Sequence, residues 1–178
     1  MGTSTVLIVD DEGGVTDAYR TYLQDEYDVR TAYSGEEALE RLDETVDVVL
    51  LDRRMPNLSG DQVLEHIRAE GYNCQVAMVT AIDPDFDIVD MPFDDYVTKP
   101  VTQDELKQTV EDMLQKRTYS EKLQALYTTA RKYATLQEEK SPEQIQGSEE
   151  FQHLQDRLHR LRREADDAVA ELNEWEGF

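Results

Sequence analysis

The sequence predicts a doubly wound α/β domain followed by a helical tail, and two observations lead to this prediction. Short runs of β-branched and apolar residues alternate with amphipathic stretches over residues 5–100, the pattern of βαβ units in a parallel sheet flanked by helices. From residue 102 to residue 140 the chain has neither glycine nor proline, so a long helix can form there. We therefore expect two domains, at residues 1–117 and 118–178.

Five short segments are predicted to be strands. They are Thr5–Val9, Val29–Ala32, Val46–Leu51, Val76–Thr80 and Tyr96–Thr98. The third contains four consecutive apolar residues, 48–51, which is typical of a strand buried on both faces. We expect it at the centre of a five-stranded parallel sheet with strand order 2-1-3-4-5.

The connections between these strands are predicted to be helical, with one exception. Apolar residues recur at spacings of three and four after the first and third strands. They are Val15, Ala18, Tyr19, Tyr22 and Leu23 in the first case and Val63, Leu64 and Ile67 in the second. A capping box from Ser34 to Glu37 predicts the start of the helix after the second strand. The fourth connection differs, because Pro84 and Pro92 confine any helix to about residues 85–91, so we expect one or two irregular turns.

The tail is predicted to form a helical hairpin or coiled coil. A capping box at residues 102–105 starts the long helix, another at residues 141–144 starts a short one, and Gly147-Ser148 precedes a final helix. Apolar residues alternate at spacings of three and four in both long helices. They are Tyr119, Leu123, Leu126, Ala130 and Tyr133, then Phe151, Leu154, Leu158, Leu161, Ala165, Ala168, Leu172 and Trp175.

The charge is strongly negative throughout, with a net value of −22. Residues 1–117 hold 27 acids against 10 bases, and residues 118–178 hold 13 against 8. Such a balance does not favour nucleic-acid binding. Repulsion between the negative charges opposes a compact fold, and salt screens this repulsion, so the charge favours a salt-loving source over an acidic mesophilic one. With no apolar run near 18 residues and no basic start, we expect no membrane span and a cytoplasmic location.

Polar residues gather where the predicted strands end. Asp10 and Asp11 follow the first strand and Asp52 the third, while Thr80 ends the fourth and Lys99 follows the fifth. Ligands of doubly wound sheets bind at the carboxyl ends of the strands, and in the expected order these ends are neighbours. Clustered carboxylates suit a hard divalent cation such as Mg²⁺, beside which a carboxylate can act as a nucleophile toward phosphorus while a lysine neutralises charge.

Four motifs resemble those of the response-regulator receiver domains of two-component systems. They are Val6–Glu12, Leu50–Gly60, Thr80-Ala81 and Tyr96–Pro100, within a resemblance that covers about residues 4–117. Their order along the chain and their places at strand ends make the match specific. The resemblance implies a flavodoxin-like fold and phosphoryl transfer from a histidine kinase.

The resemblance also implies a role for each matched residue. Asp52 would be the phosphoacceptor and a ligand of Mg²⁺. Asp11 would bind the metal directly, Asp10 mainly through water, and Arg54 through its backbone carbonyl.

The remaining matched residues would bind the phosphoryl group or respond to it. Lys99 would contact the phosphoryl group, and Thr80 would move to hydrogen-bond it. Tyr96 would follow Thr80 as the second switch residue, and the Lys99–Pro100 peptide bond would be cis.

Each of these residues also has a simpler structural interpretation. Singly, each aspartate could cap a helix and Lys99 could be a solvated charge, while Gly60 reads as a turn former. Dehalogenase-like phosphatases need an acid two residues after the nucleophile, where this chain has Arg54, and no phosphate-binding glycine loop is present. We therefore expect self-phosphorylation and autodephosphorylation, without turnover of a separate substrate.

The tail resembles the HalX-type domain that follows receivers in haloarchaea, judging from the turn at residues 140–143 and the helix start at 148–151. We expect it to serve contact with an output protein that the sequence does not name. The tail could also form a homodimer, as could the receiver's fifth helix, which begins near residue 102. The alternative is DNA binding by an arginine cluster, which is not favoured because acids lie among the arginines. Its members are Arg157, Arg160, Arg162 and Arg163.

Overall fold

The computed structural model describes residues 3–176, with side chains described up to residue 170. The chain divides into two compact units, residues 1–115 and 116–178, against an expected boundary at 117/118. None of the helices in the described part of the chain is long and apolar enough to span a membrane.

The first unit is built on a five-stranded parallel sheet. Its strands are β1 (Thr5–Val9), β2 (Asp28–Ala32), β3 (Val48–Leu51), β4 (Gln75–Thr80) and β5 (Asp95–Thr98). They lie in the order β2-β1-β3-β4-β5, and every neighbouring pair is parallel. The predicted fold class and strand order are confirmed.

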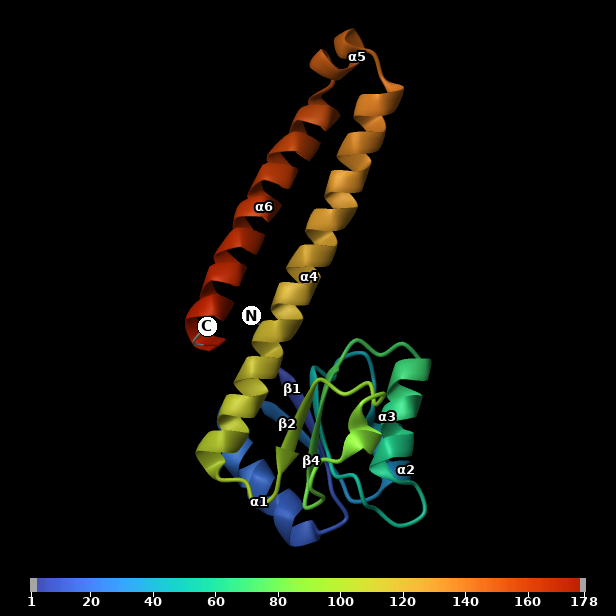
Figure 1. The fold of residues 1–178 in the computed structure, drawn as a ribbon, viewed down its shortest axis with the longest axis vertical. Helices are drawn as coiled ribbons and strands as arrows, with labels where there is room; N and C mark the ends of the chain where they lie inside the picture. The colour runs from blue at the N-terminus through green and yellow to red at the C-terminus, as the bar shows by residue number, and fades with distance from the viewer. Residues whose placement is uncertain (1–2, 177–178) are drawn as a thin grey trace. The chain divides into compact units, whose positions relative to one another are not determined.

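Helices cover both faces of this sheet. Figure 1 shows α2 (Gly35–Arg41) and α3 (Gly60–Ala69) on one side and α1 (Gly13–Leu23) on the other. Each face has its own apolar core, and consecutive residues of β3 contribute to opposite ones: Leu51 packs with α3, whereas Leu50 packs with α1. The central strand is therefore buried on both faces, as its apolar run predicts.

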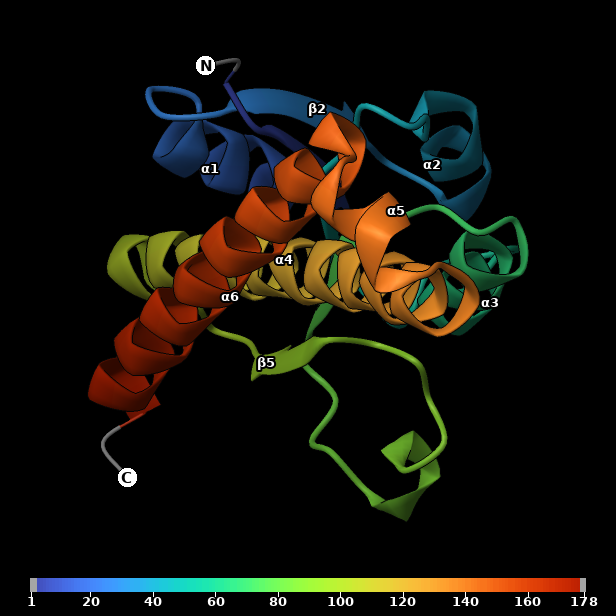
Figure 2. The ribbon, with the colours of Figure 1, turned by 90° about the horizontal axis from the view of Figure 1, so that it is seen from above.

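The connection between β4 and β5 is the exception in the structure too. It contains one short 3₁₀ helix, η1 (Phe86–Ile88), where a full helix would otherwise cover the sheet. Figure 2 shows this segment standing out beyond the edge strand β5. Phe86 and Val89 are 90% and 74% exposed, so they contribute little to either core. Pro84 and Pro92 thus limit the helix in this connection, as predicted.

The helical part consists of α4 (Gln103–Glu139), α5 (Pro142–Gln146) and α6 (Glu149–Glu176). The predicted capping boxes at residues 102–105 and 141–144 are both formed. The box at residues 34–37 is only half formed. The Ser34 hydroxyl accepts from the Glu37 amide, but the Glu37 carboxylate accepts from the amide of Tyr33 instead of that of Ser34.

The second unit has a thin core. Among the residues of this unit whose side chains the structure describes, four are buried: Thr129, Phe151, Ala165 and Ala168. The Tyr133 and Phe151 rings stack with their centroids 5.0 Å apart. The predicted stripe is wrong at Leu123, which is 40% exposed, because the buried side of the helix is centred nearer Thr129. Leu172 and Trp175 lie outside the residues whose side chains are described.

Candidate functional site

Three carboxylates meet at the carboxyl edge of the sheet. In the parallel pairing of β1 with β3, Val9 lies opposite Leu51, so the next residues, Asp10 and Asp52, are neighbours. Asp10, Asp11 and Asp52 each offer a carboxylate oxygen within 4.8 Å of the others. Asp10 and Asp52 are buried while Asp11 is exposed, so the cluster opens to solvent on one side.

Lys99 supplies the positive charge of the site. Its Nζ lies 2.5 Å from Oδ2 of Asp10 and 3.9 Å from Oδ2 of Asp52. The Lys99 amide donates to the Thr80 carbonyl at 2.8 Å, which extends the pairing of β5 with β4, and the peptide bond from Lys99 to Pro100 is cis. Lys99, directly after β5, thus lies close to the acids that follow β1 and β3.

Thr80 and Tyr96 are linked to the site through one backbone segment. Thr80 is buried, and its hydroxyl opposes the rise in pKa that burial causes at Asp52. The same hydroxyl accepts from the Ile82 amide at 3.4 Å, and the Tyr96 hydroxyl donates to the Ile82 carbonyl at 2.8 Å. Thr80, which influences Asp52, is therefore connected to Tyr96 by two hydrogen bonds through Ile82.

The environment disfavours a negative charge on Asp52. Burial is the main cause that raises the pKa of Asp52, and the Asp10 carboxylate adds to it. The Lys99 ammonium and the hydrogen bonds from Thr80 and the Arg53 amide oppose this rise. A buried carboxylate crowded by another acid is stabilised by additional positive charge, which a metal ion would provide.

The donor set fits a hard divalent cation. A pocket of about 330 Å³ opens over the cluster and is lined by Asp11, Asp52 and Lys99, together with Arg54 and Thr80. The ligand atoms within reach of one another are the carboxylate oxygens of Asp10, Asp11 and Asp52, and Mg²⁺ prefers oxygen ligands. The three aspartates could therefore hold Mg²⁺.

Two neighbours of Asp52 have roles that the sequence did not reveal. Gly60 begins α3 and donates its amide to the Arg53 carbonyl at 3.0 Å. A Cβ at Gly60 would lie 2.0 Å from the Asp52 carbonyl oxygen, so this glycine permits close packing and is not a turn former. Arg53 is buried and forms ion pairs with Asp61 and Asp87. In the sequence, only its position directly after Asp52 pointed to a role at the site.

This sheet with acids, a hydroxyl and a lysine at its carboxyl edge defines a receiver-type signalling domain. Residues 6–111 match the response regulator receiver domain family, and residues 115–178 match the HalX domain family. The chain belongs to the response regulator receiver family and continues into a HalX domain.

Similar proteins agree with this assignment. The chain is 47% identical over 165 residues to a Haloferax volcanii protein named "Putative transcriptional regulator", a match that covers 92% of this chain and 28% of that protein. It is 35% identical over 116 residues to the alkaline phosphatase synthesis transcriptional regulatory protein PhoP of Bacillus subtilis, covering 62% of this chain and 48% of PhoP. The chain thus spans about half or less of the length of these relatives.

Solved receivers have the same fold. The Thermotoga maritima response regulator TrrA, in complex with Mg²⁺ and BeF, matches with a TM-score of 0.54 and 33% identity, over 62% of this chain and 99% of TrrA. Vibrio cholerae CheY4 matches with a TM-score of 0.60 and 26% identity, over 64% and 100% of the two chains.

Proposed function

We propose that a histidine kinase donates a phosphoryl group to Asp52 in a Mg²⁺-dependent reaction, and that this switches the helical C-terminal module. The observation that supports this most directly is the position of the Asp52 carboxylate, which lies between two further acids and Lys99 at the open edge of the sheet. TrrA, a 33% identical receiver, was solved with Mg²⁺ and BeF.

In this proposal Asp52 is the nucleophile. One carboxylate oxygen attacks phosphorus, the phosphorus–nitrogen bond to the kinase histidine breaks, and the imidazole leaves with the bonding electron pair. Mg²⁺ held by Asp10, Asp11, Asp52 and the Arg54 carbonyl would supply charge neutralisation at the phosphoryl oxygens.

Lys99 and Thr80 would stabilise the product. Lys99 already lies 3.9 Å from Asp52, so a small movement away from Asp10 would let it bind a phosphoryl oxygen. The Thr80 hydroxyl, which already acts on the pKa of Asp52, would donate to another phosphoryl oxygen. Nothing in this arrangement calls for a separate substrate, so the domain would be phosphorylated and would dephosphorylate itself without other turnover.

The signal would leave the site through Tyr96 and α4. Tyr96 is tied to Thr80 through Ile82, and η1 is too short to form a normal helical signalling face. We infer that the change passes to the receiver's fifth helix, the first part of α4, and along it into residues 118–140. Beryllofluoride binding that left amide exchange over residues 101–140 unchanged would contradict this route.

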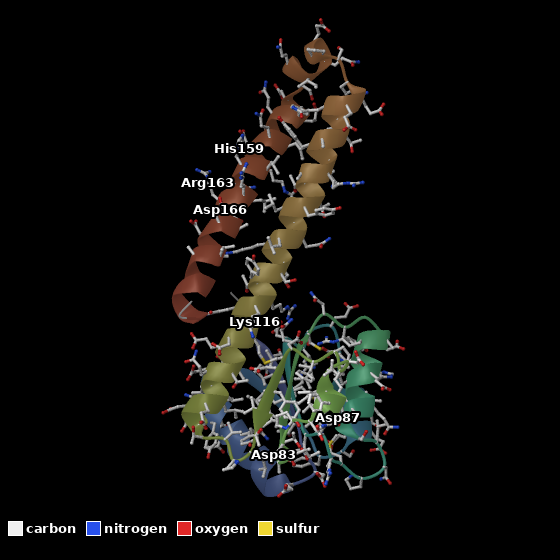
Figure 3. The ribbon with its side chains drawn as sticks, viewed as in Figure 1. Asp83, Asp87, Lys116, His159, Arg163 and Asp166 are labelled. Atoms are coloured by element: carbon white, nitrogen blue, oxygen red, sulfur yellow. The ribbon has the colours of Figure 1, made fainter. Side chains whose placement is uncertain are left out.

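The tail would serve protein–protein contact or homodimerisation. Leu123 and Tyr127 lie one turn apart and are 40% and 61% exposed, and a two-helix core is too thin to bury them. DNA binding is the second candidate, because the relatives include transcriptional regulators. Figure 3 shows Arg163 on the side of α6 away from α4, where it could meet phosphates.

The central experiment combines acetyl phosphate labelling with light scattering. Mass spectrometry should find one added phosphoryl group in the Mg²⁺-loaded protein and none in Asp52→Asn, a loss of at least about a hundredfold. Asp83→Asn, which removes an exposed acid in the segment after β4, is the matched control and should label normally. Scattering with beryllofluoride then measures whether the tail associates. Labelling that persists in Asp52→Asn would refute the proposal.

A further inference from the structure

Arg53 forms a side-chain network beside the phosphoacceptor that the proposed phosphoryl chemistry does not use. It is 8% exposed, unusually low for an arginine. Its Nε lies 3.0 Å from Oδ1 of Asp61, and its Nη2 lies 3.2 Å from Oδ2 of the same residue. Nη2 also donates to Asp87, and the Tyr96 hydroxyl, after Asp61 and Asp87, helps to raise the pKa of the guanidinium. The side chain of the residue directly after Asp52 is therefore bonded to both α3 and η1.

The segment held by this network has few bonds of its own. Within residues 85–91 three backbone hydrogen bonds are formed, from the amides of Ile88, Val89 and Met91. Phe86 and Val89 are exposed and do not anchor the segment, whereas Ile88 is half-buried and Met91 packs against the core at its far end. Asp87, labelled in Figure 3, lies in η1 itself and is the side chain through which Arg53 holds it.

A second arginine holds the far end of the same connection. Arg68 donates to the carbonyls of Pro92 and Cys74 at 3.0 and 2.8 Å and to Oδ2 of Asp94 at 2.7 Å. Arg68 belongs to α3, and none of these three bonds reaches a residue of the carboxylate cluster. It offers a natural comparison, since it holds the same connection without touching the phosphoacceptor turn.

The Arg53 contacts also close a ring of interactions that begins and ends at the phosphoacceptor. The Thr80 hydroxyl opposes the rise in pKa that burial causes at Asp52, and it accepts from the Ile82 amide, while the Ile82 carbonyl accepts from Tyr96. Together with Asp61 and Asp87, Tyr96 in turn acts to raise the pKa of Arg53, the covalent neighbour of Asp52. A change at Thr80 therefore reaches Arg53 and Asp87 without requiring a helix between β4 and β5.

We propose that Arg53 is a positioning residue that couples the state of Asp52 to the η1 segment and to Tyr96. This inference rests on the proposed function of Asp52. Binding of a phosphoryl group gives Thr80 a fixed partner, which fixes Ile82, Tyr96 and Arg53 in turn and thereby orders the segment at Asp87. Arginine suits the role because its planar group directs several donors at once, whereas lysine offers a single ammonium centre.

The experiment is hydrogen exchange over residues 84–92, with and without Mg²⁺ and beryllofluoride, in the full chain. The wild-type protein should exchange more slowly in this segment when the adduct is present. In Arg53→Met the segment should exchange about three- to tenfold faster without the adduct, and the adduct should no longer slow it. Fluorine NMR of the bound beryllofluoride shows separately that the adduct has formed.

Three further variants make the test specific. Asp87→Asn should abolish the response of the segment, and Arg53→Met added to it should have little further effect there. Arg53→Lys should restore only part of the response. Arg68→Met, the matched control, should speed exchange around residues 92–94 and leave the response to the adduct intact.

Specific outcomes would overturn the inference. If Arg53→Met bound the adduct and kept the full response, Arg53 would have no coupling role, and an equal loss in Arg68→Met would mean general loosening. If Arg53→Met failed to fold, Asp87→Asn would decide the matter alone, and a normal response in it would refute the inference. Absence of any adduct in the wild-type protein would instead refute the proposed function. In that case, hydrogen exchange over residues 84–92 in Asp87→Asn, measured without the adduct, would still test whether the Arg53–Asp87 pair holds η1.

Discussion

The receiver unit and the helical unit bury their apolar residues in different ways. In the first, a sheet with helices on both faces encloses two cores, so neighbouring residues such as Leu50 and Leu51 are both buried. In the second, helix packs on helix, and most of the apolar side chains that face inward remain partly exposed, as at Leu126 and Leu158. A layered sheet can bury both sides of a strand, whereas a helix in a hairpin can bury only one side.

This difference matches the demands placed on the two parts. The carboxylate cluster needs Asp10, Asp52 and Lys99 held by three separate strands, and a densely packed sheet provides that rigidity. The helical unit has no such cluster among its described side chains, and its exposed apolar residues, Leu123 and Tyr127, leave surface for a partner. Substitutions matched between the two units test this contrast.

The largest expected difference is between two glycines. Gly60→Ala would place a Cβ 2.0 Å from the Asp52 carbonyl oxygen, and since the clash is with backbone it should destabilise the receiver by about 3 kcal/mol or more. At Gly147 the nearest atom would be 3.5 Å away, so Gly147→Ala should change stability by less than about 1 kcal/mol. Guanidinium denaturation followed by circular dichroism measures both. Equal effects would mean that the α3 start is not tightly packed.

Next in size is the difference between two leucines. Leu50 is 1% exposed, so Leu50→Ala should destabilise by about 3 kcal/mol, the usual result of emptying a core site. Leu158 is half-buried, and Leu158→Ala should lose about 1 kcal/mol because less area leaves solvent there. The same denaturation experiment, at several protein concentrations, compares them. A loss at Leu158 as large as at Leu50, and dependent on concentration, would show that a second copy covers the hairpin.

The smallest expected effect is on the pH dependence of stability. Burial raises the pKa of Asp52, so the protonated carboxyl contributes stability that is fully present below the unfolded pKa and is lost as pH rises through the folded pKa. Asp52→Asn should therefore be more stable than the wild-type protein near neutral pH, by up to about 1 kcal/mol, and lose that advantage in acid. Melting temperatures from pH 4 to pH 8, roughly the range that spans carboxyl titration, measure this. Asp156→Asn, at an exposed site in α6, should show no such trend.

Much of the fold could be predicted because its signals are local. The apolar run at 48–51 identified the central strand, and proline at positions 84 and 92 limited the helix between them. Capping residues such as Thr102 and Ser141 marked helix starts within one residue. The stripe in the first long helix was less predictable, because 3-4 spacing identifies an apolar side but not the direction from which a partner helix covers it. Leu123 is exposed for that reason.

The site divides in the same way. The residue types at the strand ends, with the motifs around them, were enough to select Asp52, its neighbouring acids and Lys99, because parallel strands bring their carboxyl ends to one edge. Nothing local indicates that Arg53 meets Asp61 and Asp87, which are 8 and 34 residues away in the chain. Nor does spacing disclose that Gly60 must lack a side chain.

The sequence by itself determined which polar residues stand at the ends of the strands, and with them the chemistry available at one edge of the sheet. The tertiary structure alone decided which buried guanidinium holds the short η1 segment and which apolar side chains of the hairpin remain exposed. The physical reason is that strand periodicity and helix capping depend on neighbours in the chain, whereas ion pairs and close packing depend on distances that only the folded chain sets.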